Sequence, residues 1–117
     1  MNRRMVGTAY EQAALFYLEQ RGYEILETNY RCRFGEIDVI ARHKGYLVFL
    51  EVKYRSGGTK GTALEAVTRK KQAVIGKAAA WYLMERRLGD QVPCRFDVVG
   101  IDGEEVTVLE NAFSCHR

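Results

Sequence analysis

Apolar positions recur at helical spacing near the start of the chain, over residues 9–21. Glycine follows at position 22, and glycine readily adopts the left-handed conformation that ends many helices. The pattern therefore predicts a first helix over residues 9–21 that is capped by Gly22. The recurring positions are Tyr10, Ala13, Ala14, Tyr17 and Leu18.

Three strand-like segments come next. Residues 23–29 alternate between apolar and polar, whereas 36–42 and 46–54 are rich in Ile, Val, Leu and Phe. We expect an arginine-rich turn at 30–34 and a hairpin turn at the polar residues 43–45. Both faces of 46–54 are apolar, which is typical of a strand that is covered on both sides.

The second half of the chain predicts one long helix and a second hairpin. We expect a mobile, Gly-rich and basic loop at 56–61 and a short helical turn at 63–67. Thr68 suits the N-cap of a helix that runs to Leu88 and ends at Gly89. Residues 95–101 and 105–109 flank Asp102-Gly103, a dipeptide typical of hairpins. The predicted order is α-β-β-β-α-β-β, an α/β fold.

The composition of the chain favours a single small intracellular domain. The 117 residues, 47% of them hydrophobic, fit a single domain spanning residues 1–117. The net charge of +3 is compatible with a polyanionic partner. Three cysteines without CxxC spacing argue against a disulfide framework or a zinc finger and favour a reducing cytoplasm. Because no segment reads as a signal peptide or approaches ~20 apolar residues, we expect a cytoplasmic protein with no membrane partner.

Charged residues interrupt the most apolar part of the chain. Asp38 lies in the strand-like run 35–40, and Glu51 and Lys53 lie in the run 49–53. Removing such groups from water costs several kcal/mol, so they are usually paired, hydrogen-bonded or bound to a metal. These three residues are therefore a candidate site.

The register of the first hairpin decides whether these groups meet. If its loop consists of residues 44–45, Asp38 lies opposite Glu51, and directly opposed residues share a face. Lys53 shares the face of Glu51 because it is two residues further along. A three-residue loop without a bulge would instead oppose Asp38 to Leu50 and turn Glu51 away.

Two neighbouring carboxylates repel each other unless a cation lies between them. Their hard oxygen atoms suit Mg²⁺ or Mn²⁺, and the Val52 carbonyl is a further candidate ligand. Such an ion stabilises charge on a phosphate, while Lys53 orients or deprotonates water, or neutralises developing negative charge. The alternative is a cross-strand salt bridge of Lys53 with Glu51 or Asp38.

At these residues the chain resembles the PD-(D/E)xK nuclease superfamily. Residues 51–53 match the ExK half and Asp38 the preceding Asp, although Ile37 stands where the superfamily name has Pro. Within the superfamily the chain is similar to the YraN family of small bacterial proteins, over nearly its whole length. The matching residues are Glu11, Ala14, Gly22-Tyr23, Asn29-Tyr30-Arg31, 35–38, 49–55, 65–68, Lys71, Tyr82-Leu83, Arg95-Phe96-Asp97 and Asn111-Ala112-Phe113.

The resemblance implies a restriction endonuclease-like core, with a mixed sheet flanked by helices. It implies a DNA endonuclease similar to Holliday junction resolvases, dependent on Mg²⁺ or Mn²⁺, in which Asp38 and Glu51 are metal ligands and Lys53 is the catalytic lysine. Glu11 matches a glutamate of the first helix that approaches the metal. The alternative for Glu11 is a capping box with Thr8 at the start of the helix.

The expected partner is nucleic acid, most of all DNA at branched or single-stranded structures. A homodimer is a further expectation, because cutting two strands symmetrically needs two sites. The alternatives are a non-catalytic nucleic-acid-binding adaptor in DNA repair or recombination, and a scaffold in which the charges form a salt bridge. The residues expected to contact nucleic acid are Arg31, Arg33, Arg55, Lys60, Lys70, Lys71 and Gln72.

The remaining polar and aromatic residues have structural interpretations. We expect His43 in a turn, a structural hydrogen bond at Asp97, and both Trp81 and Tyr82 in the core. Tyr30 and Phe34 are better candidates for stacking on bases, because arginines surround them.

Overall fold

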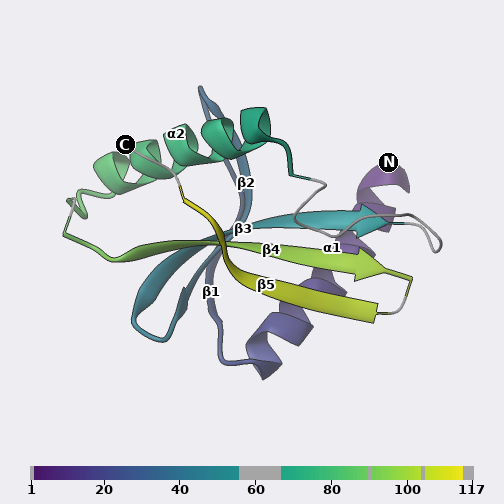
Figure 1. Cartoon of the computed structure of the whole chain (residues 1–117). Coiled ribbons are helices and arrows are strands. Elements are labelled where there is room, and N and C mark those ends of the chain that lie inside the picture. The colour runs from purple at the N-terminus through teal and green to yellow at the C-terminus, as the bar shows by residue number, and fades with distance from the viewer. Residues whose placement is uncertain (1, 56–66, 90, 104, 115–117) are drawn as a thin grey trace.

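The computed structural model describes residues 2–55, 67–89, 91–103 and 105–114, with only the backbone for 2–10 and Arg55. The loop and helical turn expected between 56 and 66 lie outside these residues. The order of elements confirms the α-β-β-β-α-β-β prediction (Figure 1). The elements are α1 (Asn2–Gln20), β1 (Glu24–Cys32), β2 (Gly35–His43), β3 (Tyr46–Arg55), α2 (Arg69–Glu85), β4 (Cys94–Asp102) and β5 (Glu105–Phe113).

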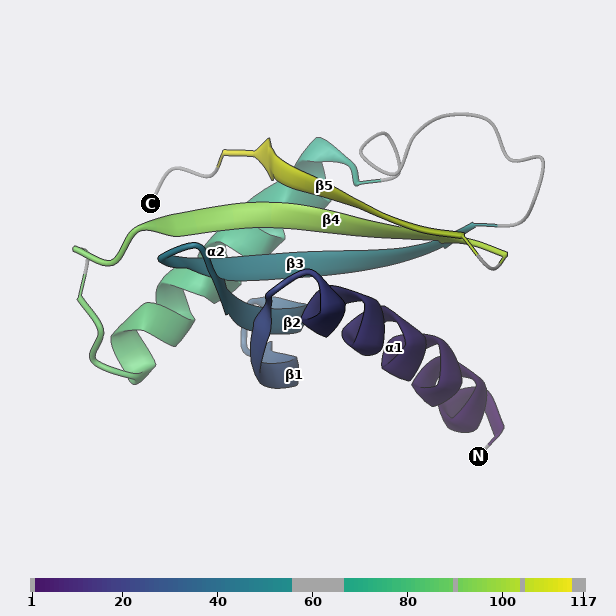
Figure 2. The ribbon, with the colours of Figure 1, turned by 90° about the horizontal axis from the view of Figure 1, so that it is seen from below.

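The strands form one mixed sheet in the order β1-β2-β3-β4-β5. Strands β3 and β4 are parallel, and the other neighbours are antiparallel. A parallel pair needs a crossover connection, which here contains α2. Helix α2 covers one face of the sheet and α1 the other (Figure 2). This α/β architecture is consistent with a restriction endonuclease-like core.

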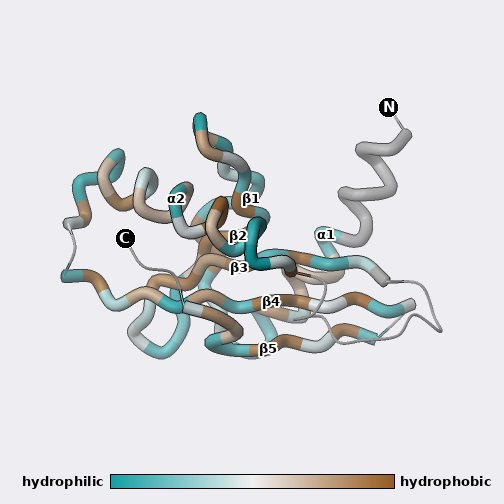
Figure 3. Tube along the Cα trace, turned by 45° about the horizontal axis from the view of Figure 1, so that its top comes forward, coloured by the Kyte–Doolittle hydropathy of each residue, from teal (hydrophilic) through white to brown (hydrophobic). Residues whose placement is uncertain are grey.

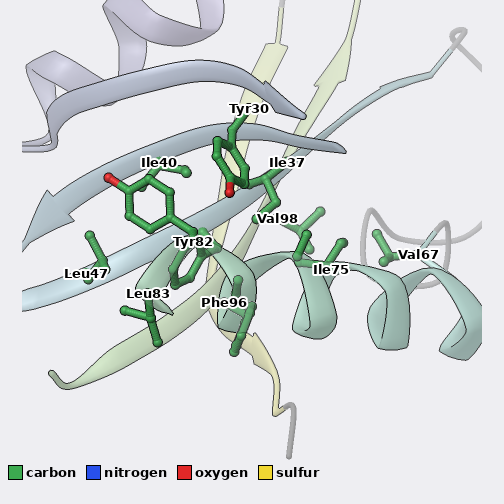
Figure 4. Packing of buried hydrophobic residues seen from close by; sticks show 13 residues of the cluster. Tyr30, Ile37, Ile40, Leu47, Val67, Ile75, Tyr82, Leu83, Phe96 and Val98 are labelled. Carbon is green, nitrogen blue, oxygen red and sulfur yellow. The ribbon is translucent and has the colours of Figure 1, made fainter. Parts of the chain in front are cut away.

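Strand β3 lies between two hydrophobic clusters. Phe49 packs in the cluster that includes Tyr82 of α2, and Leu50 packs in the cluster that includes Leu18 of α1. Figure 3 shows apolar segments along the central strands, and Figure 4 shows Tyr82 and Leu83 pointing from α2 into the first cluster. The prediction that this strand is covered on both sides is therefore confirmed.

The turn between β2 and β3 sets the register that the site requires. Lys44 has φ 53° and Gly45 has φ 85°, as a two-residue type I′ turn demands. His43 consequently pairs with Tyr46, and the pairing continues in step to the pair of residues 39 and 50. The predicted register is confirmed. Beyond that pair the ladder ends, and β2 and β3 separate (Figure 1).

The first helix is longer than its apolar pattern predicts. Helix α1 begins at Asn2, so Thr8 lies inside it and cannot cap its start. The capping-box alternative for Glu11 is therefore wrong. At the other end, Gly22 has φ 90° and Tyr23 donates its N–H to the Leu18 carbonyl, which confirms the expected glycine cap.

The second helix begins as predicted and ends early. Thr68 accepts a hydrogen bond from the Lys71 N–H at 3.1 Å, which confirms it as the N-cap. The helix ends at Glu85 because Arg87 already takes the left-handed conformation that closes it, at φ 57°, two residues before Gly89, whose φ is also positive at 77°. Leu88 then donates its N–H to a carbonyl of the last turn, as in a Schellman motif.

Two strands extend further than expected. Strand β1 runs through Tyr30 to Cys32, so the turn predicted at 30–34 shrinks to residues 33–34. Tyr30 is buried and its ring meets Tyr82 edge-on, which makes it a core residue instead of a stacking platform. Strand β5 continues past residue 109 because Phe113 pairs with Phe96 beyond a break in register.

Candidate active site

A pocket of about 220 Å³ lies where β2 and β3 separate. Asp38 and Glu51 line it just beyond the last pair of the β2–β3 ladder. Its walls come from α1, β1, β2 and β3, and include Glu11, Thr28 and Val52. The point where β2 and β3 separate is called the fork below. At the fork, the carboxylates of Asp38 and Glu51 face the same pocket, which continued pairing of the two strands would fill.

Glu51 is the most deeply buried charge of this pocket, with 4% of its surface exposed. Its Oε2 atom lies 3.5 Å from Lys53 Nζ and 3.7 Å from Lys71 Nζ. Its Oε1 atom is buried and has no hydrogen-bond partner in the described part of the chain. Buried carboxylate oxygens nearly always have a partner, so an atom of this kind suits an additional cation or donor.

Asp38 is the second carboxylate of the pocket. Burial, and after it the nearby Glu51 carboxylate, raises the pKa of Asp38 from 3.8 to about 7. The Val52 N–H opposes this by donating to Asp38 Oδ2 at 2.8 Å, which favours the charged form. In the absence of a cation, the acidic pair therefore retains a proton up to neutral pH.

Lysines from two different elements approach this acidic pair. Lys53 comes from β3, and Lys71 comes from the first turn of α2. Three consecutive cations, at positions 69–71, occupy that first turn, and no acidic residue accompanies them there. Cations are unfavourable near the positive end of a helix dipole, so this arrangement favours a bound anion.

Glu11 lines the same pocket from α1 and is partly buried. Among the described residues, no three His, Cys, Asp or Glu side chains lie close enough together to hold an ion. Asp38 and Glu51 nevertheless fit Mg²⁺ or Mn²⁺, because these ions commonly use one or two carboxylates together with waters and substrate phosphates. Glu11 and the Val52 carbonyl as additional ligands stay predictions.

The other residues expected to contact nucleic acid lie around α2 and the β1–β2 turn. Arg31 and Arg33 are exposed, and the Arg33 guanidinium lies 5.6 Å from the centre of the Phe34 ring. Lys70 is exposed, and Gln72 is partly buried and donates to a backbone carbonyl. Outside the described residues lie Lys60 and the side chain of Arg55.

A separate polar network lies near the β2–β3 turn. His43 is buried, and its ring stacks on Tyr23 at 3.8 Å, so the prediction of a turn residue is wrong. Asp97 is fully buried, accepts from Tyr23 at 2.7 Å and is paired with Arg95 at 2.7 Å. The prediction of a structural hydrogen bond at Asp97 is confirmed. The sequence gives little sign of this network, because its members are far apart along the chain.

The core prediction holds fully for Tyr82 and in part for Trp81. Trp81 packs against the first hydrophobic cluster, but it is partly exposed and also lines a groove together with Phe34. The sequence signal for this is the spacing of Ala73, Lys77 and Trp81, which places small and basic residues on the same face as the indole.

None of the described helices has the length and apolar character that crossing a membrane would require.

Comparison with known proteins identifies the family. Residues 10–101 match the model of "Uncharacterised protein family UPF0102". The "UPF0102 protein" of Lachnoclostridium phytofermentans is 49% identical over 116 residues, which cover 99% of this chain and 98% of that protein. Relatives from Shewanella sp. (strain W3-18-1) and Legionella pneumophila (strain Corby) are 48% and 46% identical, over 93% and 88% of this chain and 99% and 89% of their own lengths. The chain belongs to the UPF0102 family, the YraN family that its sequence resembles.

Proposed function

We propose that this protein is a metal-dependent endonuclease that hydrolyses phosphodiester bonds in DNA. The observation that carries the proposal is the shared pocket of Asp38 and Glu51, with Lys53 on the Glu51 carboxylate. Lys53 and Lys71 contact only Oε2 of Glu51, so the unpartnered Oε1 atom and the raised pKa of Asp38 support the binding of a further cation by this pair.

The two carboxylates and the two lysines beside Glu51 have distinct parts in the proposed reaction. Asp38 and Glu51 would hold Mg²⁺ or Mn²⁺ through their carboxylate oxygens. When bound, the ion supplies positive charge for the phosphate and lowers the pKa of water. Lys53 orients the attacking water and neutralises negative charge as it develops on the phosphate. Lys71 adds a second ammonium beside Glu51, in position to bind a phosphate oxygen.

The charges around the pocket support DNA as the substrate. The first turn of α2 carries only basic charges. Arg33 is exposed on the β1–β2 turn, and Arg31 is exposed near the end of β1, where it is paired with Glu36. Such cations bind phosphates without regard to base sequence. Branched and single-stranded DNA are the substrates to test first, and a homodimer on DNA would allow cleavage of both strands. We propose the cytoplasm as the place of action.

A cleavage assay tests the proposal. Purified protein is incubated with labelled duplex, nicked, flap and four-way DNA in Mg²⁺ or Mn²⁺. We expect cleavage by the wild type and by Lys44→Ala, a control at the β2–β3 turn, and its loss in Asp38→Ala and Lys53→Ala. Cleavage that persists unchanged in both site variants would come from a contaminant and would contradict the proposal.

A second candidate function is a non-catalytic DNA-binding adaptor in repair or recombination. The observation that favours it is the lack of a third acidic or histidine ligand among the described residues. It requires that DNA affinity, measured by anisotropy at several salt concentrations, does not depend on Mn²⁺ or on Asp38. A binding-competent wild type that neither binds Mn²⁺ nor cleaves DNA would favour this function.

A further inference from the structure

A groove of about 820 Å³ runs along one flank of α2, outside the acidic pocket. We propose that it receives an unpaired base of the DNA substrate, stacked on Trp81 and Phe34, with the adjoining phosphates on Arg69 and Lys77. This inference rests on the proposed function and adds to it a preference for single-stranded or branched DNA.

Small residues leave room along the floor of the groove. Ala73, Gly76 and Ala80 recur on one side of α2 and all line the groove. Residues three and four apart are neighbours on a helix surface, so these positions form a continuous shallow strip. A flat ring can therefore approach the helix closely without displacing a long side chain.

Aromatic rings stand at the side of this strip. Phe34 is 41% exposed at the β1–β2 turn, and its ring meets the Trp81 ring at 5.7 Å and 66°. Stacking of a base on an aromatic side chain stabilises binding by ~1–3 kcal/mol and tolerates any base. A solvent-exposed phenylalanine held against a tryptophan thus provides a stacking surface that is already formed.

The charge of the groove indicates which molecule occupies it. Arg69 and Lys77 line the groove, and Arg33 lies over the Phe34 ring. No described residue that lines the groove is acidic. The combination of basic side chains and aromatic faces is complementary to single-stranded nucleic acid, whose phosphates and bases need both.

The first turn of α2 links the groove to the acidic pair. Gln72 lines the groove, and the preceding residue, Lys71, contacts the Glu51 carboxylate. From Gln72 to Trp81 the helix rises by ~14 Å, at 1.5 Å per residue. One strand could therefore pass from the stacking surface to the acidic pair along the same helix.

The experiment uses Trp81 as its own reporter, because it is the only tryptophan of the chain. The full-length Asp38→Asn variant, which should bind without cutting, is titrated with oligothymidine and with an abasic oligomer of equal length. Indole fluorescence reports stacking, and anisotropy of the labelled oligomer reports affinity. We expect the thymidine oligomer to quench Trp81 and to bind at least about fivefold more tightly than the abasic oligomer.

Substitution of Phe34 provides the matched comparison. Phe34→Ala should weaken binding of oligothymidine at least about fivefold and leave binding of the abasic oligomer unchanged. Phe16→Ala removes an even more exposed phenylalanine from α1 and should change neither. A comparable loss with both oligomers in Phe34→Ala would mean that the base is not what Phe34 contacts, and would overturn the inference.

The remaining outcomes separate this inference from the proposed function. Cleavage by the wild type together with equal binding of both oligomers and no quenching would overturn the base-stacking groove and leave the nuclease standing. Neither binding nor cleavage of any DNA would overturn both. Concentration-dependent self-association that shifts Trp81 fluorescence without DNA would assign the groove to a second copy of this chain and would also overturn the inference.

Discussion

At the scale of single residues, the two carboxylate oxygens of Glu51 have unequal surroundings. Glu51 Oε2 has two ammonium neighbours, whereas Glu51 Oε1 has no hydrogen-bond partner among the described residues. Asp38 adds a second carboxylate whose pKa is raised to about 7. A site of this kind gains from a divalent cation, because the cation replaces the proton and satisfies the free oxygen.

The raised pKa of Asp38 makes the stability of the metal-free protein depend on pH. The folded-state pKa of Asp38 is about 7 and its ordinary value is 3.8, so between these values the folded protein binds more protons than the unfolded chain. The contribution of Asp38 to stability therefore falls as the pH rises through that window. In EDTA, the stability of Asp38→Asn relative to the wild type should rise by on the order of 2–3 kcal/mol from about pH 5 to about pH 8.5.

Urea unfolding of both proteins at the two pH values measures this difference. Asp102→Asn, at an exposed carboxylate, is the control and should show a difference from the wild type that does not vary with pH. A constant difference for Asp38→Asn as well would mean that Asp38 is ionised over the whole range.

Asp97 has a structural role that mutation can separate from the acidic pair. Asp97→Ala leaves the Arg95 guanidinium buried without its partner and should lower the free energy of unfolding by ~3–5 kcal/mol. Glu110→Ala removes a carboxylate that is 44% exposed and 3.9 Å from Arg95, and should cost less than ~1 kcal/mol. Chemical denaturation measures both. Equal losses would contradict the assignment of Asp97 as the buried partner.

At the scale of elements, the local sequence specifies the hairpin but not the fork. The Lys44-Gly45 turn fixes the register through its two positive φ values, and the apolar runs mark the strands. Pairing ends after residues 39 and 50, where the Val52 N–H donates to the Asp38 carboxylate at 2.8 Å, and no local pattern of apolar residues predicts this. The approach of Lys71 to Glu51 likewise depends on where α2 crosses the sheet.

Gly35 sets the distance between β2 and α2. A Cβ atom at this position would lie 2.5 Å from Val74 Cγ1, and the backbone φ of 151° disfavours other residues. Gly35→Ala should therefore destabilise the protein by ~1–3 kcal/mol. Val74→Ala removes the side chain that this Cβ would meet. Gly35→Ala should therefore lower the free energy of unfolding less in a Val74→Ala background than in the wild type. A double-mutant cycle in urea measures the coupling, and additive losses would contradict the close contact.

At the scale of the whole molecule, the proposed function requires DNA to bind at the basic residues around the first turn of α2. Lys70 lies in the first turn of α2, whereas Lys44 lies at the β2–β3 turn. Lys70→Ala should weaken DNA binding and reduce the slope of log K against log salt by about 0.7–0.9, according to whether the DNA is single- or double-stranded. Lys44→Ala should leave the slope unchanged. Anisotropy at several salt concentrations measures both, and equal slopes for the two variants would place DNA elsewhere.

Features that depend on contacts between distant parts of the chain could not be predicted from the sequence. The resemblance to a nuclease motif predicts Asp38, Glu51 and Lys53 as a site, and this prediction is within reach of the sequence because the three residues lie on two strands that follow each other in the chain. The buried place of His43 arises from contacts with Tyr23 and Arg95, which are distant in sequence. The groove at Trp81 likewise needs the β1–β2 turn to lie against α2. Tertiary contacts of this kind have no local periodicity.

The proposed hydrolysis of DNA requires Asp38 and Glu51 to bind a divalent cation. Crystals soaked in Mn²⁺ and measured at the manganese absorption edge test it most directly. We predict an anomalous peak between the two carboxylates, at about 2.0–2.3 Å from an oxygen of each, which is absent from Glu51→Gln crystals. A saturating soak of well-ordered wild-type crystals that leaves no peak between these carboxylates would contradict the account.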